Sequence, residues 1–171
     1  FYFCVLFTVV FCTKKPIVKD TATIDRIDNI TTWIEQSQNI KFQLSTRKEA
    51  LQKAYVSTIL LDNDSIKSNY YSKISFEADN LDSEYLFRIV NFKALSLTTK
   101  LKDTFKIGDA HWNYASFYSK KEIIDSAYYH YHEAYKNFKL LKHDYYTAKM
   151  LYNMGFLQGR LKDYTGSEVL I

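Results

Sequence analysis

Histidine is the residue type in this sequence that could most readily do chemistry, because imidazole binds metals and transfers protons near neutral pH. His130 and His132 stand two positions apart, and in a helix such side chains point about 200° apart, so they do not share an ion. His111 and His143 have no Cys, Asp or Glu at a helical spacing that would complete a zinc site. We therefore expect no bound metal and no cofactor.

Other catalytic patterns are also missing from the sequence. It contains no glycine-rich phosphate-binding loop and no nucleophile elbow, and its acidic residues fit the solvated faces of helices. Cys4 and Cys12 both lie in the N-terminal apolar run, so the body of the chain has neither a thiolate metal site nor a disulfide framework. We assign no catalytic residue and expect that the protein is not an enzyme.

The composition favours a helical protein. Apolar residues make up 47% of the 171-residue chain, which is enough for a packed domain. One proline and four glycines leave long helices uninterrupted, since an interior proline costs a helix roughly 3 kcal/mol and a glycine roughly 1 kcal/mol. The net charge of +4 is small, and the cluster of Lys136, Lys139 and Lys142 fits a solvated helix face, so we expect no nucleic-acid binding by this segment.

Residues 1–12, FYFCVLFTVVFC, form an apolar run that is too short to span a bilayer. This run fits the remnant of a signal peptide or a lipoprotein anchor, with Cys12 as the lipidation site. Phe11 departs from the lipoprotein pattern, in which a small residue precedes the cysteine, so an uncleaved anchor and a simple export signal remain as alternatives. Residues 13–20 read as a linker. We expect export and association with the periplasmic side of a membrane.

An internal period of 40 residues organises the rest of the chain. Two series of small residues and one series of large residues recur at this spacing: Ala54, Ala94 and Ala134; Ser75, Ala115 and Gly155; Ile74, Tyr114 and Met154. Small residues let antiparallel helices approach closely, while Tyr118 and Tyr131 fill the space around the contact. The apolar stripe from Ala127 to Phe138 has helical spacing and lacks the alternation of a strand.

The pattern predicts four helix pairs: 22–38 with 43–61, 65–79 with 83–102, 108–120 with 123–141, and 144–160 with a helix that begins near 164. Residues 62–65, Asp-Asn-Asp-Ser, and residues 79–80, Asp-Asn, supply turn and cap side chains at two of the joints. The apolar pattern is still running at Ile171. We therefore expect residues 21–171 to form a repeat domain that is truncated at its C-terminus.

Residues 113–135 resemble a tetratricopeptide repeat. In that family the first helix of a unit carries a large, a small and an aromatic residue, and the second carries a small, an aromatic and a small residue. The matching residues here are Tyr114, Ala115 and Tyr118, then Ala127, Tyr131 and Ala134, and in the next unit Met154, Gly155 and Ser167. Gln158 departs from the expected aromatic, the closing proline is missing, and the period exceeds the common 34 residues. The resemblance implies an all-α, right-handed superhelical array of antiparallel helix pairs, a tetratricopeptide-like solenoid.

The resemblance also implies a binding surface, because in this family the first helix of each pair lines a groove. The residues that follow the apolar stripe on these helices are the candidates for a peptide-binding groove: Trp112, Ser116, Lys149, Tyr152, Phe156 and Arg160. Aromatic and arginine side chains are frequent anchors in protein interfaces. The alternative is that Trp112 and Phe156 pack between neighbouring units.

The chain is similar, in segment 161–168, LKDYTGSE, and in its lysine- and tyrosine-rich style, to the N-terminal repeat region of flavobacterial regulators. Those proteins place such repeats ahead of a helix-turn-helix or histidine-kinase module. This similarity implies a non-enzymatic protein–protein interaction scaffold, the sensory or assembly part of a bacterial signalling or transcriptional regulator, with a protein or peptide partner. The alternative function is that of an exported helical-repeat lipoprotein involved in the uptake of nutrient glycans.

Overall fold

The computed structural model describes residues 21–162, which contain seven α-helices and no strand. This part of the chain confirms the expected all-α class, and the helices fall close to the ranges expected from the sequence. They are α1 (Thr21–Gln38), α2 (Leu44–Ile59), α3 (Asp64–Asn80), α4 (Glu84–Leu101), α5 (Thr104–Lys120), α6 (Ile124–Leu140) and α7 (Asp144–Arg160).

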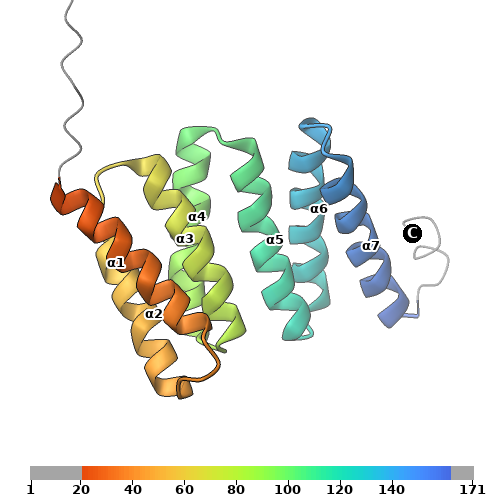
Figure 1. The fold of residues 1–171 in the computed structure, drawn as a ribbon. Helices are drawn as coiled ribbons and strands as arrows, with labels where there is room; N and C mark the ends of the chain where they lie inside the picture. Colours follow the sequence, from red (N-terminus) through yellow and green to blue (C-terminus); the bar gives the residue numbers. More distant parts are fainter. Residues whose placement is uncertain (1–20, 163–171) are drawn as a thin grey trace, which may run out of the picture.

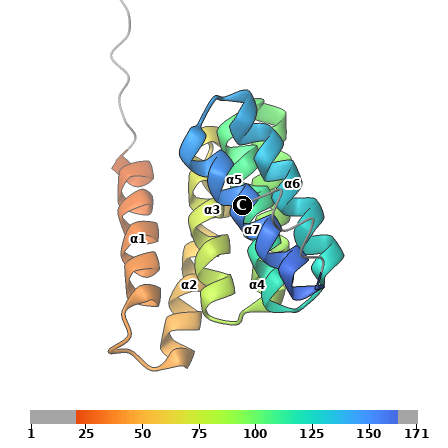
Figure 2. The same ribbon diagram turned by 90° about the vertical axis from the view of Figure 1, so that its right-hand side faces the viewer.

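Consecutive helices run antiparallel and contact one another along the whole series, most extensively in the hairpins α1–α2, α3–α4 and α5–α6 (Figure 1). Contacts also join α1 to α3 and α3 to α5, which are not consecutive. The odd-numbered helices therefore lie beside one another in one layer, and the even-numbered helices form a second layer. Figure 2 shows the two layers from the end at which α7 lies.

The helices after the first hairpin end in the same way at intervals of twenty residues. Asp82, Lys102, Glu122, Lys142 and Lys162 all have left-handed backbone conformations, with φ between 49° and 61°. In each of the first four turns, the amide of the following residue closes the helix on a carbonyl five positions earlier, as in the bond of 3.0 Å from Asp103 N to Thr98 O. None of these five residues is glycine, so each turn adopts a backbone conformation that an L side chain disfavours.

Helix α5 begins at Thr104, four residues before the start that the sequence indicates. Asp103 caps it, because its side chain accepts a hydrogen bond from the amide of Lys106. Gly108 consequently lies inside the helix, where a Cβ atom would stand 3.0 Å from the ring of Phe138. The glycine therefore marks a close approach of α5 to α6.

The small residues that recur every 40 positions all lie in the core: Ala54, Ala94, Ala134, Ser75, Ala115 and Gly155. Ile74 and Met154 of the large series are buried as well, and so are Ala127 and Tyr131. Tyr114 and Tyr118 are half-buried and pack against the core from its edge. The stacked rings of Phe87 and Phe117, with centroids 4.4 Å apart, join α4 to α5. The period of 40 thus corresponds to the packing of one helix pair on the next.

A buried polar network crosses the same joint. The side chain of Asn91 on α4 accepts a hydrogen bond of 2.8 Å from Ser75 Oγ on α3 and donates one of 2.9 Å to the carbonyl oxygen of Ala110 on α5. Asn91 and Ser75 are both completely buried. Three helices are therefore tied together at a single side chain.

The N-terminal features of the sequence lie outside the described residues. These are the apolar run 1–12 with Cys12, and the linker 13–20. The helix expected near residue 164, with Ser167, lies outside them as well. Among residues 21–162, none of the helices combines the length and the hydrophobicity that crossing a membrane requires.

Candidate protein-binding surface

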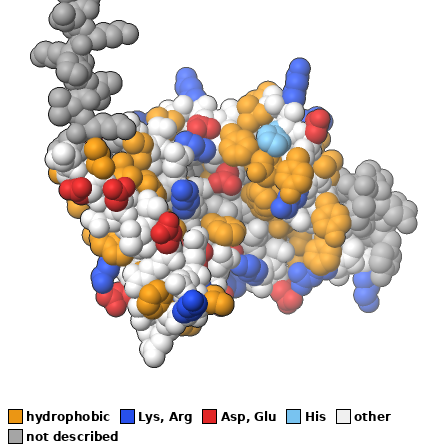
Figure 3. Space-filling view, in the orientation of Figure 1, with side chains coloured by type: hydrophobic (Ala, Val, Ile, Leu, Met, Phe, Trp, Pro, Cys, Tyr) orange, Lys and Arg blue, Asp and Glu red, His pale blue; other side chains and the backbone are white. Residues whose placement is uncertain are grey.

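The odd-numbered helices form one continuous surface, which we call the odd-helix face (Figure 3). Polar contacts join α1 to α3 and α3 to α5. The hydroxyl groups of Thr31 and Tyr70 lie 3.0 Å apart between α1 and α3, and Lys120 forms an ion pair of 2.6 Å with Asp79 between α5 and α3. Hydrophobic side chains gather on this face over α5 and α7, on the right of Figure 3.

Two hollows lie on this face, each between neighbouring odd-numbered helices. The first, of about 260 Å³, lies between α1 and α3 and includes Glu35, Tyr70 and Lys73 in its wall. The second, of about 300 Å³, lies between α3 and α5, and its wall includes Trp112 and Ser116. The two hollows follow one another across the layer of odd-numbered helices, so an extended ligand could contact both.

Asn113 lines the second hollow and has an amide donor that makes no hydrogen bond within residues 21–162. Its Nδ2 atom is buried and has no hydrogen-bond partner among the described residues. A buried amide group without a partner is energetically costly. Since this donor makes no hydrogen bond with the described part of the chain, a rotation that brought it to a ligand carbonyl would break none there and would remove that cost. The hollow therefore combines an aromatic wall with an unused amide donor.

Burial shapes the electrostatics of the same hollow. Burial raises the pKa of the Asp109 carboxyl above its ordinary value, while the hydrogen bond from Ser72 Oγ opposes that shift. Asp79 at the other end of the wall is paired with Lys120. Of the two carboxyl groups in the wall, Asp79 is thus paired with a cation, and Asp109 is held by a hydroxyl group.

The surface of α7 continues the odd-helix face as an aromatic stripe. Tyr145, Lys149, Tyr152 and Phe156 recur at helical spacing, and the three aromatic residues are each more than half exposed. The ammonium group of Lys149 lies over the ring of Trp112 on α5, 4.6 Å from its centroid, and 5.8 Å from that of Tyr145. A cation between two rings gives the stripe a positive centre.

The six groove residues expected from the sequence do not meet in one pocket. Trp112 and Ser116 line the second hollow, Lys149 lies against Trp112, and Tyr152 and Phe156 are exposed along α7. Arg160 forms an ion pair of 2.7 Å with Glu122, in the turn after α5.

Trp112 also has the packing role that the sequence left open. Its ring contacts that of Tyr146 on α7 edge to face, with centroids 5.7 Å apart. It is half-buried, whereas Phe156 is 55% exposed and so keeps most of its surface open to solvent. Trp112 therefore joins two units and faces the hollow at the same time.

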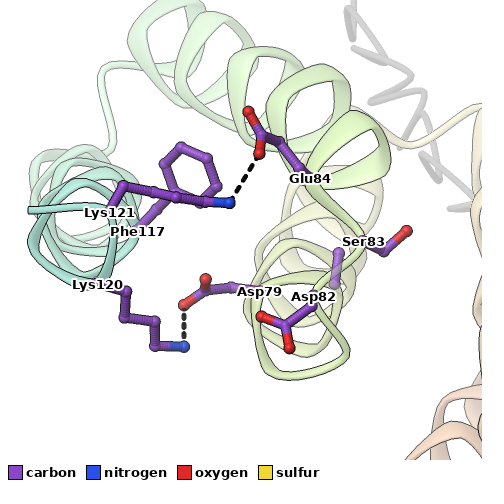
Figure 4. A pocket seen from close by; sticks show the side chains of 8 residues that line it. Asp79, Asp82, Ser83, Glu84, Phe117, Lys120 and Lys121 are labelled. Carbon is purple, nitrogen blue, oxygen red and sulfur yellow. Dashed lines mark hydrogen bonds and ion pairs between the residues drawn. The ribbon is translucent and has the colours of Figure 1, made fainter.

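A further pocket, of about 140 Å³, lies at the turn between α3 and α4 (Figure 4). Lys120, the last residue of α5, pairs with Asp79, and Lys121, which follows it, pairs with Glu84 over 2.9 Å. Both lysines therefore reach the preceding helix pair. The ring of Phe117 lies beside Lys121, whose ammonium nitrogen is 5.8 Å from the ring centroid. These two ion pairs link the second helix pair to the third and pair four of the charged groups that line the pocket.

The structure brings together two histidines from neighbouring helices. His111 Nδ1 on α5 lies 3.0 Å from His130 Nδ1 on α6, so one ring donates a hydrogen bond to the other. Burial, followed by the repulsion from His111, lowers the pKa of His130 to about 4. The sequence contained a signal for this contact. His111 lies ten residues before the turn at 121–123 and His130 lies seven residues after it, and antiparallel helices bring such positions to within about one helical turn of each other.

Metal ligands do not accumulate around this pair. Among residues 21–162, no three His, Cys, Asp or Glu side chains are close enough together to hold an ion. His132 is exposed and turns away from His130, as its helical spacing indicates.

Comparison of the chain with models of known protein families, with curated proteins and with solved structures finds no match.

Proposed function

We propose that the chain is a non-enzymatic scaffold that binds an extended segment of a partner protein on its odd-helix face. Stacked helix pairs create a long surface from repeated units, and such surfaces suit extended ligands. In this proposal the array is a right-handed, tetratricopeptide-like superhelix and the odd-helix face is its inner side. The period of 40 and the burial of the recurring small residues support it.

The observation that carries the proposal is the hollow between α3 and α5 beside the stripe on α7. Trp112 forms a wall of this hollow and is also the neighbour of Lys149, so the two features are continuous. Exposed aromatic residues offer a large contact area at a small cost in conformational entropy, and they are enriched among the residues that dominate binding energy. Asn113 adds a donor for a backbone carbonyl of the ligand.

The setting that we propose follows the resemblance to the repeat regions of flavobacterial regulators. The chain would then be the sensory or assembly part of such a protein, with the partner bound to the array and its N-terminal segment associated with a membrane. Within residues 21–162, no cluster of side chains has metal-binding geometry.

The experiment compares partner capture by the unchanged chain and by the double variant Tyr152→Ala/Phe156→Ala, from extracts of the cells that produce the protein. Both side chains are more than half exposed, so their removal leaves the core intact. If they anchor the partner, each contributes over about 1 kcal/mol, and capture should fall by about tenfold or more.

A matched variant and a melt complete the design. Leu140→Ala removes a side chain that is 74% exposed on α6, in the other layer, and should leave capture unchanged. Unchanged capture by the double variant would show that the partner binds elsewhere. A lowered melting temperature of the double variant would show instead that the two rings stabilise the array.

A further inference from the structure

A separate groove lies on the side of the even-numbered helices. It has a volume of about 580 Å³, larger than either hollow of the odd-helix face, and α4, α5 and α6 all contribute to its wall. Its lining residues are Arg88, Ile89, Phe92, Lys93, Tyr114, Tyr118 and His130. We call this the α4–α6 groove. Volumes of this size are typical of ligand-binding sites.

Three aromatic rings pack on one another along one side of the α4–α6 groove. The rings of Tyr118 and His130 are nearly parallel, at 7° with centroids 5.5 Å apart, and Tyr114 stacks on His130 at 4.8 Å. The hydrogen bond to His111 fixes the orientation of His130 from behind. A wall held in this way is preformed, and it offers an aromatic surface against which an aromatic side chain can pack.

The opposite wall is apolar and cationic. Ile89 and Phe92 supply the apolar part, and Phe92 is 66% exposed, far more than a ring that only fills the core. Arg88 and Lys93 are the charged residues of the lining, and the lining contains no acidic residue.

The cations of this groove are only partly neutralised by the rest of the molecule. Arg88 pairs with Glu84 over 2.8 Å, but Lys121 binds the same carboxylate over 2.9 Å, so one anion serves two cations. Lys93 has no ion-pair partner among the described residues. The groove therefore keeps an excess of positive charge beside its aromatic wall, and its complement is a negative charge beside an apolar ring.

We propose that the α4–α6 groove is a second binding site, which takes an acidic segment of a partner protein that presents an aromatic side chain next to carboxylates. The ring of the segment packs against the aromatic wall of Tyr114, Tyr118 and His130. The neighbouring carboxylates meet Lys93 and Arg88 at the rim. The exposure of Phe92 leaves the groove open along one side, which suits a chain passing through better than an enclosed small molecule. This site is independent of the proposed use of the odd-helix face.

The probe is a synthetic peptide, acetyl-Gly-Asp-Glu-Phe-Glu-Asp-Gly-amide, added to the isotopically labelled chain and followed by amide chemical shifts. We expect shifts that map to α4, α6 and the second half of α5. Two altered peptides test the chemistry: in one, Asn and Gln replace the acids, and in the other Gly replaces the Phe. Each should bind about fivefold or more weakly, the loss expected when an anchor worth over about 1 kcal/mol is removed.

Matched lysine variants locate the charge. Lys93→Gln should weaken binding of the probe by about fivefold or more, whereas Lys139→Gln, which removes the same charge from an exposed position at the far end of α6, should not. The proposal is overturned by equal binding of the neutral peptide, by equal effects of the two variants, or by shifts confined to the odd-helix face. Benzoate competing as strongly as the peptide would also overturn it, since the groove would then be a small-molecule site.

Discussion

Asn91 is the side chain on which we expect the joint between the second and third helix pairs to depend. It is completely buried, accepts a hydrogen bond from Ser75 and donates one to the carbonyl oxygen of Ala110. Asn91→Ala removes both hydrogen bonds, leaves the buried hydroxyl of Ser75 without its acceptor, and opens a void between three helices. The substitution should therefore lower the free energy of unfolding far more than the loss of an exposed amide would.

The magnitude follows from the two bonds and the stranded hydroxyl. Each hydrogen bond contributes about 1 kcal/mol, and an unpaired buried hydroxyl costs about 1–3 kcal/mol. Rotation of the Ser75 hydroxyl toward a backbone carbonyl of its own helix would recover part of this loss. We expect a total of about 3 kcal/mol, which corresponds to a fall of about 6–12 °C in melting temperature for a domain of this size.

The assay is unfolding in urea, followed by far-ultraviolet circular dichroism, for Asn91→Ala, Ser75→Ala and the double variant. Ser75→Ala removes the hydroxyl group that Asn91→Ala would leave without a partner. The double variant should therefore lose about 1 kcal/mol less free energy of unfolding than the two single variants lose together. Strictly additive losses would show that the two side chains do not act together. A loss below about half a kcal/mol for Asn91→Ala would refute the network as a determinant of stability.

Three further predictions concern packing, pH and the turns. Ala134→Trp overfills a fully buried contact and should cost about 1–3 kcal/mol or more in a thermal melt, whereas Lys139→Ala should change stability by about half a kcal/mol or less; equal effects would mean that the packing is wrong. Because the pKa of His130 is depressed to about 4, stability should be complete above pH 6.5 and should fall as the pH drops from 6.5 to 4. Since the ring is half-exposed, the loss should be about 1–2 kcal/mol, and an equally steep loss in His130→Phe would contradict this assignment. Lys102→Gly relieves a left-handed backbone conformation and should raise the unfolding free energy by about 0.5–1 kcal/mol, whereas no change in urea unfolding would show that the turn is unstrained.

The helices could be predicted from the sequence because their signals are local. Residues 124–140 carry an apolar stripe at helical spacing, and Asn63, which caps α3, is one of the residues 62–65 expected to supply turn and cap side chains. The small residues of period 40 indicated where helices approach one another, and Ala54, Ala94 and Ala134 are all buried. A repeated pattern strengthens such a prediction, because the same small residues must recur at the same positions in each unit.

The turns and the true start of α5 could not be predicted in the same way. Left-handed turn residues are usually glycine, but here Lys102, Glu122 and Lys142 hold these positions, so composition gives no sign of them. Gly108 suggests a boundary of α5, whereas it allows a close approach to Phe138 in the interior of that helix. Only tertiary packing distinguishes these two uses of glycine.

The sequence predicts which residues of the candidate surface lie on the exposed side of their helix, but it does not predict which residues they contact. The register placed Tyr152 and Phe156 on the outside of α7, and both are exposed. Nothing in the sequence indicates that Trp112 packs on Tyr146, or that Arg160 pairs with Glu122, because these contacts join residues that are 34 and 38 positions apart. The α4–α6 groove was missed for the same reason, since three helices build its wall.

The most direct test of the odd-helix face is site-specific photo-crosslinking in cells that produce the protein. Benzoylphenylalanine replaces Tyr152, which is 57% exposed on α7, and in a control it replaces Val56, which is 49% exposed on α2 in the other layer. We predict a covalent adduct with a partner protein from position 152 and none from position 56. An adduct from position 56 without one from position 152 would contradict the proposed binding face.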